Sequence, residues 1–195
     1  MSSSKQWDRE REDPRVFVVS DTHFGHKGAL KWGHRPWESV DDMDRALIRV
    51  WNEVVPENGI VLHLGDFSWV SPAVYLASLN GEISIMLGNH DKPKELRACV
   101  DSGLLKEYRH VLYYRWMGHR FWFSHYAHRF WLNSERGVFH GYGHNHGDAE
   151  DHGKSTDVGI DGEFCTLNGR PWAPTPLWML VDYLKDRPNI FRHPE

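Results

Sequence analysis

The sequence predicts an α/β protein built on two sheets with helices on the outside. In the first half, short β-branched apolar runs alternate with helical patterns, which is the order of a parallel sheet. In the second half, a hairpin and two further strand patterns precede a closing helix. No repeat or linker interrupts residues 14–195, so we expect one domain there, and the polar residues 1–13 are expected to be a flexible N-terminal arm.

Three strands are predicted in the first half, at residues 16–19, 60–64 and 83–87. The first run is continuously apolar and the other two are apolar except for His63 and Ser84, which indicates strands buried on both faces. Helical patterns separate these runs, so we expect parallel strands with right-handed crossovers. The predicted helices begin at Asp41 or Asp42, at Ser71-Pro72 with an end at Asn80-Gly81, and at Pro93 with an end towards Gly103.

The second half is predicted to add a second sheet. Residues 111–116 and 120–125 flank Met117-Gly118-His119, which is typical of a hairpin turn. Residues 138–142 and 155–160 are two more strand candidates. Thr175-Pro176 is expected to open the closing helix.

Composition argues against several classes of protein. The 195-residue chain has a formal net charge of −4, so no basic excess marks a nucleic-acid or membrane-surface binder. No run approaches the roughly 18 apolar residues of a membrane span, and the polar start does not resemble a signal peptide. The two cysteines form no disulfide framework. We therefore expect a cytoplasmic protein without a membrane partner, and its 14 histidines draw attention to metal binding.

Potential metal ligands follow each apolar strand of the first half. Asp21 and His23 come after the first strand, Asp66 after the second and Asn89 after the third. Ligands of open α/β sheets bind at the carboxyl ends of strands, so these side chains are expected to converge.

The second half supplies three more histidines at strand ends. His125 ends one strand, and His144 and His146 follow the next with a spacing of two. The whole set combines two aspartates, one asparagine and four histidines. Mixed nitrogen and oxygen donors suit Mn, Fe or Zn better than Ca or Mg.

These blocks together resemble the calcineurin-like metallophosphoesterase superfamily, and the stretch 20–27 with Arg35-Pro36 also resembles its small single-domain members from bacteria and phages. The blocks occur in the order of the family: Asp21-Thr22-His23, Gly65-Asp66, Gly88-Asn89-His90-Asp91, His125 and Gly143-His144-Asn145-His146. The resemblance implies a four-layer α/β/β/α sandwich of two mixed β-sheets flanked by helices. It also implies a metal site at the carboxyl ends of the strands.

The resemblance further implies a role for each matching residue. The first metal would be held by Asp21, His23, Asp66 and His146, and the second by Asp66, Asn89, His125 and His144, with Asp66 bridging both. His90 would act on the substrate as a catalytic residue, and Asp91 would orient it. Two divalent transition-metal ions are implied, with Mn favoured and Fe, Zn or Ni as alternatives.

Other residues are open to more than one interpretation. Arg35 and Arg129 are candidate substrate-binding residues at the rim, although a solvated arginine is the commoner case. His63 is expected in the core or behind the ligands. Trp69 follows Gly65-Asp66 where many relatives carry a charged residue, and its role is open between cleft and packing. The same applies to Trp131 and Trp172, and five further histidines are expected at the surface or rim: His26, His34, His128, His140 and His152.

The expected function is hydrolysis of a small phosphorylated substrate by a metal-bridging hydroxide, with a phosphodiester favoured over a phosphomonoester. One alternative is a metal-dependent nuclease acting on DNA or RNA, which the acidic charge balance disfavours. The other is a non-catalytic binding module on the same fold, like the retromer subunit that shares this architecture. Retention of all seven ligand positions and of His90 argues against that module.

Overall fold

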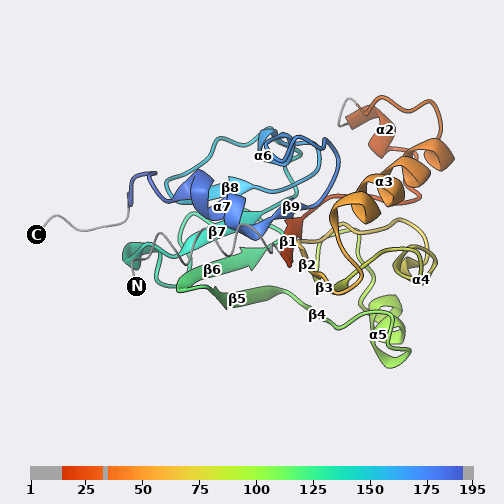
Figure 1. Cartoon of the computed structure of the whole chain (residues 1–195), viewed down its shortest axis with the longest axis horizontal. Coiled ribbons are helices and arrows are strands. Elements are labelled where there is room, and N and C mark those ends of the chain that lie inside the picture. Colours follow the sequence, from red (N-terminus) through yellow and green to blue (C-terminus); the bar gives the residue numbers. More distant parts are fainter. Residues whose placement is uncertain (1–14, 33–34, 191–195) are drawn as a thin grey trace, which may run out of the picture.

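The computed structural model describes residues 15–32 and 35–190, so the expected arm at 1–13 and His34 lie outside these residues. Its strands form two mixed sheets that pack against each other across a shared apolar core (Figure 1). The first sheet has the order β4-β3-β2-β1-β9, and its strands are β1 (Val16–Val19), β2 (Ile60–His63), β3 (Glu82–Met86), β4 (Glu107–Arg109) and β9 (Thr175–Pro176). The second sheet has the order β5-β6-β7-β8, with β5 (Val111–Trp116), β6 (His119–Ser124), β7 (Phe139–Tyr142) and β8 (Ser155–Asp157).

Helices cover the outer sides of the two sheets. On the side of the first sheet lie α2 (Ala29–Trp32), α3 (Val40–Val54), α4 (Pro72–Leu76) and α5 (Pro93–Asp101), and on the side of the second lie α6 (Glu163–Thr166) and α7 (Leu177–Leu184) (Figure 1). The short 3-10 helix η1 (Ser134–Arg136) precedes β7. The predicted four-layer α/β/β/α sandwich is therefore confirmed. Within the described residues, no helix is long and apolar enough to cross a membrane.

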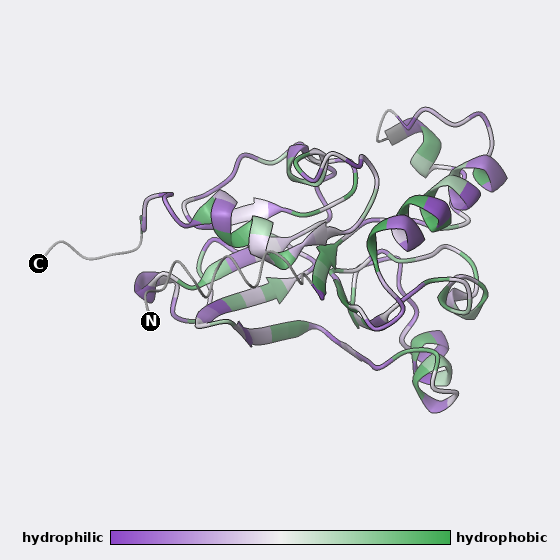
Figure 2. Ribbon diagram, in the orientation of Figure 1, coloured by the Kyte–Doolittle hydropathy of each residue, from purple (hydrophilic) through white to green (hydrophobic). Residues whose placement is uncertain are grey.

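The central strands are buried on both faces, as their mainly apolar runs predict. Phe17 and Val19 of β1 pack in the core beneath α3, whereas Val16 and Val18 pack in the core shared with the second sheet. Figure 2 shows β1 as hydrophobic, whereas α3 alternates between hydrophobic and hydrophilic turns. β1, β2, β3 and β4 pair in parallel, so their carboxyl ends meet at one edge.

Helix boundaries differ from the prediction in three places. Ser39, and not Asp41 or Asp42, caps α3, because its hydroxyl accepts the N–H of Asp42 at 3.1 Å. α4 ends at Leu76 rather than at Asn80, whose side-chain amide instead donates to the Val55 carbonyl at 3.1 Å. Thr175-Pro176 does not open a helix but pairs with β1 as the antiparallel edge strand β9, and α7 begins one residue later.

The predicted hairpin joins β5 and β6, which pair antiparallel. Its turn has two residues, Met117 and Gly118, both with positive φ (53° and 81°), so His119 belongs to β6 and not to the turn. β6, β7 and β8 then run parallel, which brings their carboxyl ends together as well. β8 is shorter than predicted and ends at Asp157.

Candidate metal centre

The predicted ligands lie in loops that leave the carboxyl ends of five strands. The loops after β1 and β2 run together, because the N–H groups of Asp21 and His23 donate to the carbonyls of Gly65 and Asp66, both at 3.0 Å. The second sheet is joined to this region by the N–H of Ile160, which donates to the Ser20 carbonyl at 3.1 Å. The two sheets therefore present their ligand loops to a common place.

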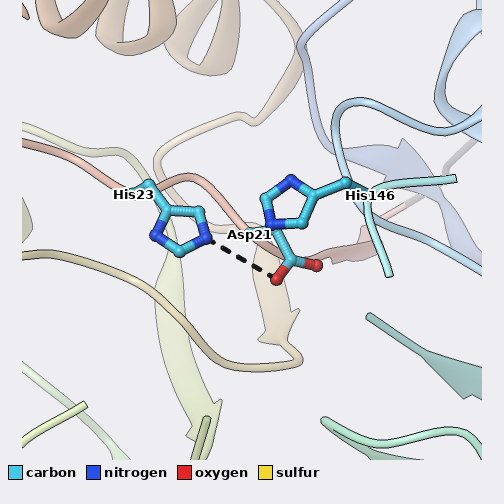
Figure 3. Close-up of side chains that lie close together, drawn as sticks. All are labelled: Asp21, His23 and His146. Atoms are coloured by element: carbon cyan, nitrogen blue, oxygen red, sulfur yellow. Dashed lines mark ion pairs between the residues drawn. The ribbon is translucent and has the colours of Figure 1, made fainter. Parts of the chain in front are cut away.

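Asp21, His23 and His146 form the first cluster (Figure 3). Their ligand atoms all lie within 4.8 Å of one another. The two imidazole rings lie nearly parallel, with centroids 5.1 Å apart, and His23 Nε2 lies 3.9 Å from Asp21 Oδ1. Ligand atoms bound to one ion at about 2.1 Å are at most about 4.2 Å apart, so this cluster is close to a metal-binding arrangement.

Asp66, His125 and His144 form the second cluster, again with ligand atoms within 4.8 Å. Asn89 adjoins it, with its Oδ1 atom 3.2 Å from His125 Nε2. The Asp66 Oδ2 atom lies 3.4 Å from His125 Nε2 and 3.7 Å from His23 Nε2 of the first cluster. Asp66 therefore stands between the two clusters, where a carboxylate can serve both.

The backbone at the ligand positions is held in a conformation that side chains rarely adopt. Five of the seven predicted ligands have positive φ, between 50° and 73°: Asp21, His23, Asp66, His144 and His146. Such residues cost of the order of 1–3 kcal/mol each and persist where the surrounding structure enforces them. Backbone strain of this kind clusters at ligand-binding sites, so its concentration on these positions points to one.

Two glycines leave room for the carboxylates of the clusters. A Cβ atom at Gly88 would overlap the carboxylate of Asp66, and one at Gly143 would overlap Ser20 and the carboxylate of Asp21. Any other residue at either position would displace a ligand. The glycines in the Gly88-Asn89 and Gly143-His144 blocks are thus required by close approach.

Hydrogen bonds fix which nitrogen two of the histidines offer. His125 Nδ1 lies 2.8 Å from the Leu64 carbonyl, which can only accept, so Nδ1 carries the proton and Nε2 faces Asp66 and Asn89. His146 Nδ1 lies 2.7 Å from the carboxylate of Asp161, which leaves its Nε2 for the first cluster. Carboxylate or carbonyl partners of this kind orient metal-binding histidines in general.

Arg35 supports the first cluster from behind and is not a rim residue, so the structure corrects its predicted place. Its guanidinium is buried and makes a two-point ion pair with Asp161 at 2.8 and 2.9 Å. It also donates to the carbonyls of Asp21 at 2.6 Å and Thr22 at 2.9 Å. Arg129, by contrast, is exposed in the loop after β6, and its binding role stays a prediction.

The electrostatics of the clusters favour a bound cation. Burial and the neighbouring Asp157 carboxylate raise the pKa of Asp21 well above its ordinary value. Burial opposes a charge on His125, but its hydrogen bond to Asp66 and the Asp21 carboxylate outweigh that effect and raise its pKa to about 9. The site therefore gathers buried negative charge and retains protons that divalent ions would displace.

Asp91 joins the loops that carry two ligands. Its carboxylate accepts the backbone N–H groups of Asp66, Phe67 and Gly88, each at 2.9 Å. The imidazole of His90 is partly exposed, with its Nε2 atom 3.9 Å from Asp66 Oδ2. His90 thus lies beside the clusters, and orientation of its ring by Asp91 stays a prediction.

His63 lies behind the ligands, as expected. It is fully buried, and its Nδ1 atom accepts the N–H of Gly65 at 3.2 Å, so Nε2 carries the proton and donates to the Thr22 hydroxyl at 3.0 Å. The Thr22 hydroxyl donates in turn to the Phe67 carbonyl at 2.8 Å. His63 therefore ties the loop after β1 to the loop after β2.

Two histidines lie deeper than their predicted place at the surface or rim, and two of the three tryptophans left open are packed against other residues, with Trp172 half-buried. His140 is buried, and its ring accepts the N–H of His128 at 3.0 Å; His26 is also buried, 7% exposed, beside His23. Trp131 is buried and donates to the Val138 carbonyl, and Trp172 packs against Trp37. Trp69 alone of the three tryptophans is largely exposed.

Sequence reasoning did not identify Asp157 and Asp161 as parts of the site. Asp157 accepts the N–H groups of Gly147 and Gly159 at 3.0 and 2.7 Å, and Asp161 holds both Arg35 and His146. The available signal was their place at and after the strand pattern 155–160, the same signal that identified Asp21 and Asp66.

This geometry agrees with the match to a family model described as calcineurin-like phosphoesterase, which spans residues 14–184. The chain belongs to the calcineurin-like phosphoesterase family. The donor set of each cluster, one aspartate and two histidines with Asn89 beside the second, fits divalent transition-metal ions.

Among curated proteins, the chain is 40% identical over 83 residues to an uncharacterized protein of Methanocaldococcus jannaschii, covering 40% of this chain and 47% of that protein. It is 33% identical over 84 residues to the gene 66 protein of Mycobacterium phage D29, covering 40% of this chain and 41% of that protein. The chain thus spans less than half the length of the curated relatives it matches.

Two solved structures share the fold. A protein of unknown function from Aquifex aeolicus aligns with a TM-score of 0.60 and 17% identity over 82% of this chain and 94% of that one. An archaeal phosphodiesterase aligns with a TM-score of 0.51 and 20% identity over 77% of this chain and 85% of that one.

Proposed function

We propose that the protein hydrolyses a small phosphorylated substrate with two divalent transition-metal ions, Mn favoured, and prefers phosphodiesters to phosphomonoesters. The observation that carries the proposal is the pair of Asp/His clusters with Asp66 between them. The diester preference draws on the archaeal phosphodiesterase of the same fold.

The side chains divide into those that hold the ions and those that face the substrate. Asp21, His23 and His146 would hold one ion, His125, His144 and Asn89 the other, with Asp66 shared. When bound, the pair would lower the pKa of water towards neutrality and balance the charge of the phosphoryl oxygens.

His90 contributes at the substrate side. Its imidazole is 27% exposed and lies 3.9 Å from the shared carboxylate, so it can reach a phosphoryl group held there. A protonated His90 would donate to the leaving oxygen as the ester bond breaks, and the proton would depart with the alcohol. Asp91 keeps the loop around Asp66 and Gly88 in place through its three backbone contacts.

The proposal is tested with a panel of bis-p-nitrophenyl phosphate, p-nitrophenyl phosphate, cyclic nucleotides and oligonucleotides, each with Mn, Ni, Zn and Mg. Metal-dependent turnover with diesters ahead of monoesters is expected. Asp66→Asn should abolish turnover, whereas Asp101→Asn, at the exposed end of α5, should not change it.

Three results would contradict this assignment. Oligonucleotides cleaved far better than small diesters would indicate a nuclease. Metal binding without turnover of any substrate would indicate a binding module. Turnover that survives Asp66→Asn would show that the clusters are not the active site.

A further inference from the structure

Trp69 is an exposed aromatic side chain at the edge of the first cluster. It follows the Gly65-Asp66 turn by three residues, and 47% of its surface is exposed. Its backbone is fixed, because its N–H donates to the Phe24 carbonyl at 2.8 Å. The position therefore combines a held backbone with an indole open to solvent.

His26 backs one face of this indole. The two rings are parallel within 4°, with centroids 4.1 Å apart. The His26 ring is itself buried and reaches His23, with the two Nδ1 atoms 3.4 Å apart. The indole is thus held in one orientation from behind, which leaves its exposed surface preorganised for a ligand.

The indole also lies next to the substrate side of the centre. Its ring centroid is 5.2 Å from that of His90, and His90 Nε2 is 3.9 Å from the carboxylate of Asp66. A group joined to a phosphoryl held near Asp66 and His90 is therefore within reach of Trp69.

We propose that Trp69, backed by His26, is a stacking surface for a planar aromatic base, so that the substrate is a nucleotide ester. This inference rests on the proposed function and names its substrate class. Stacking of a base on an aromatic side chain is worth roughly 5- to 150-fold in affinity. An indole needs no particular hydrogen-bond pattern for this, so the preference concerns the presence of a base rather than its identity.

Tyr126 is the competing aromatic residue, since it is 48% exposed and lies beside the second cluster. Its ring contacts His144 and His125 at 64° and 72°, with centroids 4.7 and 5.0 Å apart. Among residues 15–32 and 35–190, no aromatic ring stacks parallel to the Tyr126 ring as His26 does to Trp69. Trp69 is therefore the better candidate to stack against a nucleobase, and a Tyr126 variant serves as the comparison in the test.

The test measures binding and does not need turnover. Calorimetry on the Mn²⁺-loaded protein compares the non-cleavable phosphonate analogue of thymidine 5′-phosphate with the deoxyribose analogue, the phosphonate of 1,2-dideoxyribose 5-phosphate, which carries hydrogen in place of the base. These ligands differ only in the base. The thymidine analogue should bind about 10-fold more tightly or better.

Variants assign the preference to a side chain. Trp69→Leu should bring the two affinities within about 2-fold while leaving the deoxyribose analogue unchanged, and Trp69→Phe should keep part of the preference. The aromatic control is Tyr113→Leu, since the Tyr113 ring lies on β5 under Arg115. This variant should bind both analogues as the wild type does.

Equal affinities of the two analogues in the wild type would overturn the inference. So would a preference that survives Trp69→Leu, or one that Tyr126→Leu abolishes in its place. Absence of hydrolysis together with an intact base preference would instead refute the proposed function alone, so the two failures are distinguishable.

Discussion

Replacement of Arg35 by methionine should weaken both the fold and the first cluster. The guanidinium makes a two-point pair with Asp161 and donates to the carbonyls of Asp21 and Thr22. Methionine retains much of the apolar volume but none of the donors. Asp161 would then keep a buried carboxylate with His146 as its remaining described side-chain partner.

The magnitude follows from burial. The side chains of Arg35 and Asp161 are 0% and 1% exposed, so Arg35→Met removes one partner of a buried ion pair. The free energy of unfolding should therefore fall by about 3–5 kcal/mol. For a domain of this size, each kcal/mol lowers the melting temperature by roughly 2–4 °C, so a fall of about 6–20 °C is expected. Because Asp161 orients His146, metal affinity at the first cluster should fall by about 10- to 100-fold.

Thermal melting and metal titration of the variant give both quantities. Arg49→Met is the matched control: Arg49 pairs with Glu53 on α3 at 3.1 Å, but its side chain is 66% exposed, so a change of only about 0.3–0.5 kcal/mol is expected. Arg35→Lys should fall between Arg35→Met and wild type, since an ammonium cannot reproduce the two-point pair. If Arg35→Met melts and binds metal like Arg49→Met, the reasoning is wrong.

Three further predictions concern other parts of the molecule. His90→Ala should lower kcat by about 10²- to 10⁴-fold while both metals stay bound. The loss should be smaller for substrates with a p-nitrophenolate leaving group than for those with an alkoxide, because p-nitrophenolate hardly needs a proton. Equal losses of kcat on the two kinds of substrate would remove the general-acid role. Gly143→Ala should reduce metal content and melting temperature, because its Cβ would overlap Ser20 and Asp21; wild-type values would refute the close-packing argument. Burial lowers the pKa of His140 from its ordinary 6.5 to about 3. Below pH 6.5 the unfolded chain takes up a proton that buried His140 does not, so the free energy of unfolding falls by about 1.4 kcal/mol per pH unit as the pH drops towards 3. Urea unfolding between pH 4 and 7 should therefore show a shallower pH dependence in His140→Gln, and identical dependences would contradict this.

The parts of the fold that the sequence predicts are those with local signals. Val16–Val19 is continuously apolar because both faces of β1 are buried, and the residues directly after it, Asp21 and His23, fall at the sheet edge as a result. Tight turns such as Met117-Gly118 are equally local.

The features that sequence reasoning missed depend on contacts between distant segments. From the sequence alone Arg35 is interpreted as a surface cation, because its partner Asp161 is 126 positions away and only the fold brings the two together. β9 is a strand only because Thr175-Pro176 lies against β1, and His140 is buried only because β7 is an inner strand of its sheet. Local pattern carries no information on such pairings.

The count of bound metal ions tests the two-cluster account most directly. Protein reconstituted with Mn²⁺ and freed of excess ion should contain about two ions per chain by elemental analysis. Asp66→Asn, which removes the carboxylate between the clusters, should fall well below that value while remaining folded. A reproducible content of one ion or none in the folded wild-type protein, or an undiminished content in Asp66→Asn, would contradict a shared centre.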